Sequence, residues 1–500
     1  MFNKTKVTNK TMELADCKAE WTFNETYKCW CLEDILYTAK AVTPKFQRLS
    51  IFVPEPYMRK DGEINQARQM NGYTAQTVPV IFENNSAGYM QMAHTWLGGP
   101  RCYAEQYLEQ GYVYITCGNR GHESKDADGR YCGKAPANLV DLKTALRFIR
   151  HNKSLIPGDM NKIISVGWSA GGAMSTLLAV TGNNKNFTSY LEENGAFMEE
   201  SDAVYASQIY CPVTDLEHAD LAYEWLFAAD KENEAGAVAP AGIMTPFEEA
   251  LSIKLKDAYI NYFNNLKLVN PDNKEILQLT GDGRTGNGYE YLMSKLNESA
   301  SIYLKKLENK ELSAEYSVAD YILANEKSEW LSWDGKKAII KSLDSYILSH
   351  RRRLKPCTSF DTLKKESCEN RVFGTPENPN MHFNPQIADA ISELREQFPK
   401  EYAEYYTEYA KVKDDANLAK RVYLINPLNY IGTDEKSDQA KYCRIRVGAS
   451  DADTSFTVSM TLALKLQEAG IQTDYQIVWE QPHSEADYKG EVIDWIKSIV

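Results

Sequence analysis

The sequence predicts an α/β fold, in which a mostly parallel sheet carries helices on both faces and one large, mainly helical segment is inserted. Short β-rich runs alternate with helical patterns up to about residue 215 and again from about residue 440, as in a parallel sheet with crossover helices. Between these two regions the chain is charged, rich in tyrosine and helical in period, and it is too long to be a simple connection. We therefore predict a core domain formed by residues 1–215 and 440–500 and an inserted lid domain formed by residues 216–439.

The core elements follow from hydrophobic periodicity. The helix expected over 136–152 carries apolar residues at i, i+3/i+4 and i+7, the spacing of a helix face that packs on a sheet. The other helices are expected at 101–110, 170–181, 454–469 and 485–499. Strands are expected at 48–54, 77–83, 112–118, 162–168, 204–213, 442–448 and 474–480.

Charge and hydropathy exclude several classes of partner. The 500 residues are 43% hydrophobic, and 56 basic against 69 acidic residues give a net charge of −13. That balance argues against nucleic acid or an anionic membrane as a partner, because both require a basic surface. No run of 18 apolar residues is present, so no transmembrane helix is predicted. The first residues lack the apolar stretch of a signal peptide, which predicts a cytoplasmic location, or a secreted one if such a peptide has been removed.

The cysteines and histidines do not form a recognisable metal site. Ten cysteines are scattered along the chain without a CxxC pair, and there is no HExxH motif. Several cysteines lie in apolar runs, where a free thiol behaves as a small buried hydrophobe. We expect no metal, no cofactor and no disulfide framework.

The stretch Gly167-Trp168-Ser169-Ala170-Gly171 identifies a candidate nucleophile. It lies between a predicted strand and a predicted helix, the context that a GxSxG turn requires in an α/β-hydrolase. Glycines at 167 and 171 remove side chains that would collide with the sharp turn at Ser169. The N–H of Ala170, at the start of the helix, is then expected to face a developing oxyanion. A nucleotide-binding turn would instead require GxGxxG or GxxxxGK[ST], and neither is present.

A second oxyanion donor is expected from the loop after an early strand. Residues 83–93 form that loop, and Gly88 in it allows the backbone to approach a substrate closely. The sequence does not choose among the N–H groups of Ala87, Gly88 and Tyr89.

The general base follows from chain order. In α/β-hydrolases the nucleophile precedes the acid and the acid precedes the histidine, which excludes the histidines before Ser169. His483 follows the last predicted strand and precedes the last predicted helix, which is the required position. Ser484 is then expected to be the N-cap of that helix, with Asp487 three residues on. His382 lies in the lid, where contact with substrate suits it better than the role of base.

The acid is expected after the penultimate strand. Asp451 and Asp453 both follow the strand over 442–448, and Asp451 is the nearer of the two. Its carboxylate there would hold the imidazole in the required tautomer. Asp453 is alternatively the N-cap of a helix beginning at Thr454.

These residues and several longer segments resemble the bacterial tannases and their feruloyl esterase relatives. The resemblance rests on "GYM" after the early strand, "APANLVDLKTALRFIRHN", "SAGGAMSTLLAVTGN", "DADTS", the C-terminal histidine loop and the large insertion. It implies an α/β-hydrolase fold and a serine esterase that acts on small phenolic esters. In that family a lysine and a glutamate of the lid, with an aspartate two residues after the acid, bind the three ring hydroxyls. The matching positions are Lys355, Glu369 and Asp453.

Three functions remain in competition, and a fourth, a serine peptidase, is disfavoured because no propeller repeat precedes the motif. A galloyl ester hydrolase acting through Ser169, Asp451 and His483 and an acyl-enzyme is the favoured interpretation. A feruloyl or hydroxycinnamoyl esterase would use the same residues with a different lid pocket. A non-catalytic binding protein of the same fold is disfavoured, because it has little reason to retain all three side chains.

Overall fold

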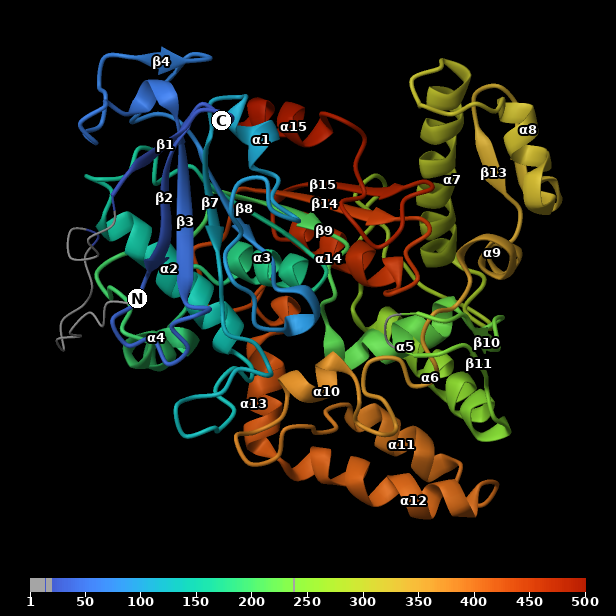
Figure 1. The fold of residues 1–500 in the computed structure, drawn as a ribbon. Helices are drawn as coiled ribbons and strands as arrows, with labels where there is room; N and C mark the ends of the chain where they lie inside the picture. Colours follow the sequence, from blue (N-terminus) through green and yellow to red (C-terminus); the bar gives the residue numbers. More distant parts are fainter. Residues whose placement is uncertain (1–13, 15–19, 237–238) are drawn as a thin grey trace.

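A nine-stranded sheet forms the centre of the computed structural model, which describes residue 14, residues 20–236 and residues 239–500 (Figure 1). The strand order is β1-β2-β3-β7-β6-β8-β9-β14-β15. The six strands from β7 to β15 in this order pair in parallel, whereas β1, β2 and β3 join them antiparallel at one edge. The strands are β1 (Thr22–Asn24), β2 (Cys29–Leu36), β3 (Arg48–Pro54), β6 (Val80–Asn84), β7 (Val113–Cys117), β8 (Ile163–Trp168), β9 (Ala206–Tyr210), β14 (Tyr442–Gly448) and β15 (Gln472–Val478).

Helices cover both faces of this sheet (Figure 1). Helices α2, α3 and α14 lie on one face, and α1 and α15 lie on the other. Strands β6 to β9 are buried along their whole length, and the sequences of β7 and β8 are accordingly rich in apolar residues rather than alternating. The core helices are α1 (Ala104–Leu108), α2 (Ala137–His151), α3 (Ala170–Val180), α4 (Thr188–Glu193), α14 (Phe456–Glu468) and α15 (Glu491–Ile499).

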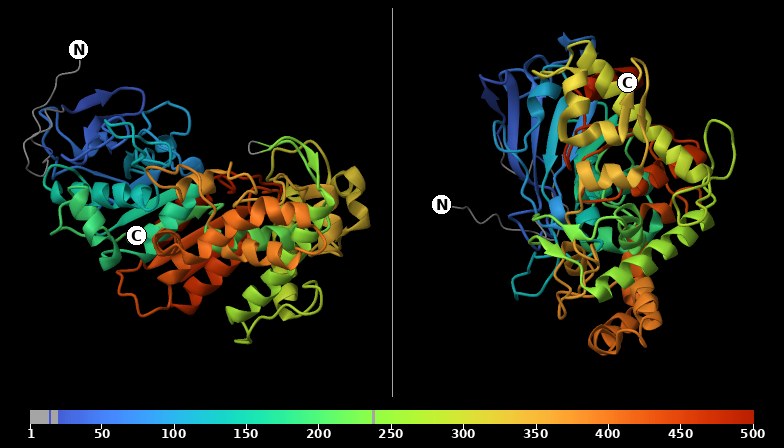
Figure 2. Two further views of the ribbon diagram at one scale, coloured as in Figure 1. Left: turned by 90° about the horizontal axis from the view of Figure 1, so that it is seen from below. Right: turned by 90° about the vertical axis from the view of Figure 1, so that its right-hand side faces the viewer.

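The chain between β9 and β14 is mainly helical and does not add a strand to the sheet (Figures 1 and 2). Its α7 and α8 lie far from its α11 and α12, and α7 packs against the edge strand β15 of the sheet. The inserted helices are α5 (Leu216–Leu226), α6 (Pro246–Asn265), α7 (Asn287–Glu308), α8 (Val318–Leu323), α9 (Leu343–Tyr346), α10 (Cys368–Val372), α11 (Pro385–Glu393), α12 (Pro399–Ala410) and α13 (Ala416–Leu424). Its two small ribbons pair β10 (Glu232–Asn233) with β11 (Gly242–Ile243) and β12 (Leu331–Trp333) with β13 (Ala338–Ile340). A third ribbon, β4 (Gln69–Met70) with β5 (Tyr73–Thr74), lies in the core.

Two predicted helix starts were wrong. Helix α15 begins at Glu491 with Gly490 as its N-cap, so Ser484 is not a cap, and its carbonyl instead accepts the N–H of Ala486. Helix α14 is capped by Ser455, whose hydroxyl accepts the N–H of Thr457, and not by Asp453. In both cases the loop after the strand is longer than expected, and these loops carry His483 and Asp451.

The helices and the cysteines can be compared with the expectations of no transmembrane helix and no disulfide framework. Among the described residues, none of the helices combines the length and apolarity needed to cross a bilayer. The nine cysteines within the described ranges are free thiols, whereas Cys17 and the first 13 residues lie outside those ranges.

Candidate active site

Ser169 sits on a strained turn between β8 and α3. Its φ of 60° and ψ of −128° lie in a region that non-glycine residues seldom adopt. The glycines on either side make the turn possible, because a Cβ on Gly167 would lie 2.3 Å from the carbonyl oxygen of Gly171. A Cβ on Gly171 would lie 3.0 Å from the Asn84 side-chain oxygen. The predicted strand–turn–helix context of Ser169 is therefore present.

A chain of two hydrogen bonds joins Ser169, His483 and Asp451. The Ser169 Oγ lies 2.8 Å from His483 Nε2, and His483 Nδ1 lies 2.8 Å from Asp451 Oδ2. Asp451 is fully buried, and its other oxygen accepts the backbone N–H of Asp453 at 2.9 Å. Of the two aspartates that the sequence left open, Asp451 is the one in contact with the imidazole.

The electrostatics of this chain follow from a buried carboxylate beside an imidazole. Burial would raise the pKa of Asp451, but His483 and, to a lesser extent, Arg351 hold that pKa below its usual value. Burial would lower the pKa of His483, but the Asp451 carboxylate outweighs this effect and holds it well above its usual value. The pair therefore favours an ionised carboxylate and an imidazole that accepts a proton readily.

Cys211 lies beside these residues, and the sequence did not single it out. It follows β9 directly at a φ of 35°, and its side chain is buried. One ligand atom each from Cys211, Asp451 and His483 lie within 4.8 Å of one another. A thiol, a carboxylate and an imidazole suit a soft divalent ion, but here Asp451 and His483 bond to each other and burial raises the pKa of the thiol. Cys211 follows the carboxyl end of β9, which pairs with β8, and this position could have identified it from the sequence.

Two elements that carry candidate oxyanion donors pack against each other beside Ser169, namely helix α3 and the turn containing Gly88. Ala170 is the first residue of α3, so its N–H has no acceptor within the helix. The loop with Gly88 forms a 3₁₀ turn over Ala87–Tyr89, with Gly88 at φ 56°. The N–H of Tyr89 already donates to the carbonyl of Ser86 at 3.0 Å, which leaves Ala87 and Gly88 as the better donor candidates.

The insertion places Lys355 and Glu369 near the same turn. A Cβ on Gly88 would lie 3.2 Å from the sulfur of Cys368, so the start of α10 packs directly on the turn. Glu369 is the next residue and is buried; burial raises its pKa, Lys355 opposes that rise and Asp453 adds to it. Lys355 is also buried, and its Nζ lies 3.9 Å from the centroid of the Phe360 ring. Lys355 and Asp453 are therefore both close enough to Glu369 to influence its pKa.

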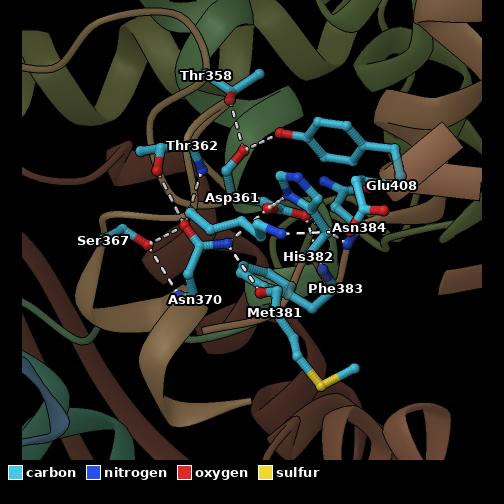
Figure 3. A network of polar contacts seen from close by, with 12 residues as sticks. Thr358, Asp361, Thr362, Ser367, Asn370, Met381, His382, Phe383, Asn384 and Glu408 are labelled. Atoms are coloured by element: carbon cyan, nitrogen blue, oxygen red, sulfur yellow. Dashed lines mark hydrogen bonds and ion pairs between the residues drawn. The ribbon is translucent and has the colours of Figure 1, made fainter. Parts of the chain in front are cut away.

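A polar network within the insertion supports α10 (Figure 3). The Asn370 amide donates to Asp361 at 2.7 Å, and the Ser367 hydroxyl accepts the N–H of Asn370 as the N-cap of α10. His382 Nδ1 lies 2.6 Å from Asp361, and the His382 ring stacks on Tyr409. This network holds the backbone on both sides of Glu369. His382, expected to suit substrate contact, contributes to this internal support through its Nδ1.

Comparisons with known proteins identify relatives of this chain. The family model described as BD-FAE matches residues 73–237. A tannin acyl hydrolase from Lactobacillus plantarum is 30% identical with a TM-score of 0.79, covering 98% of this chain and 96% of that one. A Fusobacterium nucleatum tannase is 29% identical with a TM-score of 0.79, covering 98% of both chains. A tannin acyl hydrolase in complex with ethyl gallate is 30% identical with a TM-score of 0.80, covering 98% of this chain and 99% of that one. The search of the curated proteins finds no match.

The fold and these relatives define a carboxylic ester hydrolase of the α/β-hydrolase fold. Its relatives place it among ester hydrolases of the tannin and feruloyl type. Because the 30% identity extends over nearly the whole of both chains, the chain belongs to the bacterial tannase family.

Proposed function

We propose that this protein hydrolyses galloyl esters of tannins and simple gallates by a serine mechanism with an acyl-enzyme intermediate. The observation that carries the proposal is the hydrogen-bonded chain Ser169–His483–Asp451. Lys355 and Glu369 support it, because Glu369 is influenced both by Lys355 and by Asp453, which lies two residues after Asp451. Ser169, His483 and Asp451 suit acyl transfer. Lys355 and Glu369 suit the binding of a hydroxylated ring.

In the first step His483 Nε2 removes the Ser169 proton while Oγ attacks the ester carbonyl. The carbonyl oxygen becomes an oxyanion that accepts hydrogen bonds from the N–H of Ala170 and from the turn containing Gly88. His483 then protonates the alcohol oxygen as its bond to carbon breaks, which leaves the acyl group on Ser169. Water, deprotonated by His483, attacks this acyl-enzyme, and the free acid leaves with Ser169 reprotonated.

The ring of the acid is proposed to bind between Lys355, Glu369 and Asp453. Phenol hydroxyls donate to carboxylates, and an ammonium group stabilises a partial negative charge on a phenol oxygen. Related tannin acyl hydrolases have been solved in complex with ethyl gallate and with 3,4-dihydroxybenzoate, which supports a hydroxylated benzoyl ring as the acyl part. The substrate is a small phenolic ester, and the mechanism uses neither a cofactor nor a metal ion.

The second candidate is a feruloyl or hydroxycinnamoyl esterase, which the BD-FAE match over residues 73–237 favours. A comparison of kcat/KM for methyl gallate, methyl 3,4-dihydroxybenzoate, methyl benzoate and methyl ferulate separates the two. The galloyl proposal predicts good hydrolysis of the first two esters and hardly any of the benzoate, because each polar group left unpaired costs about 1–3 kcal/mol. A preference for methyl ferulate would favour the second candidate.

A further inference from the structure

A cavity lies next to the loop that carries His483, on the sheet face covered by α1 and α15. Its volume is about 190 Å³. Residues on one face of adjacent strands form its floor, namely Glu83 on β6, Val166 and Trp168 on β8, and Tyr210 on β9. The loop that carries His483 forms part of its wall through residues 485 and 487–490. Lys355, Glu369 and Asp453 do not line it, so it is separate from the proposed site for the acyl ring.

Glu83 is a buried carboxyl group with one oxygen unused. Its Oε2 accepts a hydrogen bond from the Tyr114 hydroxyl, while its Oε1 has no hydrogen-bond partner among the described residues. The residue is 1% exposed. Burial raises the pKa of Glu83 to about 8, and nearby Glu485 adds to that rise. An orphaned polar atom of this kind costs free energy unless a ligand or water satisfies it, and Oε1 belongs to a residue that lines the cavity.

The other polar groups of the cavity are mixed in character rather than uniformly acidic. The Tyr488 hydroxyl is also buried and without a partner among the described residues. Glu485 offers acceptor oxygens, and Lys489 offers a cation at the rim. Asp487 is already bound by Arg444 at 2.7 Å and by the Tyr210 hydroxyl at 3.0 Å, so it adds no free charge. Such a set matches groups that both donate and accept hydrogen bonds, as phenol hydroxyls do, better than it matches a cation.

Aromatic rings supply the apolar walls. Tyr103 and Trp168 meet edge to face with their ring centroids 5.1 Å apart, and Tyr107 lines the cavity next to them. Planar aromatic walls favour a planar aromatic occupant. A cavity of roughly 150 Å³ is enough to hold a benzene ring, so this one has room for a single hydroxylated ring.

Two residues that line the cavity are chain neighbours of Ser169 and His483, whose side chains lie 2.8 Å apart. Trp168 is the residue directly before Ser169, and Glu485 follows His483 by two positions. We propose that this cavity is a second phenolic-ring subsite, which binds a hydroxylated ring in the alcohol portion of the ester while the acyl ring lies between Lys355, Glu369 and Asp453. This inference rests on the proposed function and adds to it a binding site for the alcohol portion of esters that carry more than one phenolic ring.

The test is a ratio of two substrates that share an acyl group. We would measure kcat/KM for a gallic acid ester of a polyhydroxylated phenol and divide it by kcat/KM for methyl gallate. Tyr488→Phe and Glu485→Ala should each lower this ratio by about tenfold through the loss of one hydrogen bond, while methyl gallate is hydrolysed as before. Tyr402→Phe on α12 is the matched control and should leave the ratio unchanged. Equal ratios in the wild type and both variants would overturn the subsite.

A binding experiment separates the failure of the subsite from the failure of the proposed function. Ser169→Ala, saturated with gallate, would be titrated calorimetrically with 1,3-dihydroxybenzene, and with an arylalkylammonium salt in a parallel run. We expect the dihydroxybenzene to bind once more per chain and this event to disappear when Tyr488→Phe is added. Binding of the ammonium salt instead, or no binding beyond the gallate site, would contradict the proposal. An enzyme that does not hydrolyse methyl gallate would refute the proposed function, and this titration would still test the cavity.

Discussion

The Tyr223 hydroxyl donates a 2.9 Å hydrogen bond to the carbonyl oxygen of Ala452, the residue between Asp451 and Asp453. The same hydroxyl accepts the backbone N–H groups of Leu354 and Lys355, at 3.2 and 3.1 Å. One buried side chain on α5 therefore fixes the loop that carries the proposed acid to the segment that carries the proposed ring-binding lysine. These hydrogen bonds therefore position the proposed site for the acyl ring from both sides.

Removing that hydroxyl should affect gallate binding more than acyl transfer. Tyr223→Phe leaves two N–H groups and one carbonyl unpaired, and each costs about 1–3 kcal/mol. We expect KM for methyl gallate to rise about tenfold or more, with little change for a small activated acetate ester. Tyr37→Phe is the matched control, because its hydroxyl donates to Gly118 in the core. It should lower the melting temperature without this selectivity, and an equal loss on both esters in Tyr223→Phe would show a purely structural role.

The two aspartates should separate by role. Asp451→Asn removes the group that bonds to His483 Nδ1, and it should reduce turnover of every ester by about 10⁴-fold because the imidazole loses the required tautomer. Asp453→Asn should spare the small acetate ester and impair the galloyl ester. The reverse pattern in steady-state kinetics would identify Asp453 as the acid.

The lid residues should act on substrate binding. Lys355→Ala and Glu369→Gln should each weaken transition-state binding of gallate esters by about 1–3 kcal/mol and leave small activated esters nearly unaffected. The readout is kcat/KM for both ester types, with Lys364→Ala as a control for the loss of a nearby lysine. Unchanged gallate kinetics in both variants would move the preference to the feruloyl esterase interpretation.

The pH profile should reflect the raised pKa of His483. Only the neutral imidazole can accept the Ser169 proton, so kcat/KM should rise with pH and reach its half-maximum above the ordinary histidine value of 6.5. Asp451→Asn should move that midpoint downward, because the carboxylate is the group that raises it. The stability of the fold should change in the opposite direction. The His483–Asp451 ion pair stabilises the folded state fully below about pH 6.5, and this stabilisation is lost as the pH rises through the pKa of His483 in the folded protein. A half-maximum of kcat/KM at or below pH 6.5 would contradict the proposal that the Asp451 carboxylate raises the pKa of His483.

Much of the core was predictable because its signals are local. Each predicted strand of the parallel core overlaps an observed one, and the strand over 442–448 coincides with β14. The central strands β6, β7 and β8 are marked by apolar residues because both of their faces are buried. Strand β2 was missed because Glu33 and Asp34 interrupt its apolar residues. The pairing of β2 with β3 shifts register at this point, and Asp34 adopts a positive φ. The start of the last helix was misplaced because Gly490, rather than the polar Ser484, ends the loop.

The parts of the site that depend on distant contacts were not predictable. Ser169, His483 and their chain order carry a motif, so they could be selected from the sequence. Cys211 and Tyr223 carry none, because their significance comes from the elements packed against them. The cavity around Glu83 likewise depends on three strands and a loop that only the fold brings together.

The central claim is that Ser169 is the nucleophile of a galloyl ester hydrolase, and the most direct measurement is kcat for methyl gallate in Ser169→Ala. We expect kcat to fall by about 10⁶-fold with an unchanged melting temperature, because the variant retains the fold and loses only the attacking oxygen. Ser498→Ala on α15 serves as the control and should retain full activity. A folded Ser169→Ala enzyme that kept about a tenth of the wild-type rate would contradict the account, since a reaction that proceeds through this hydroxyl cannot survive its removal.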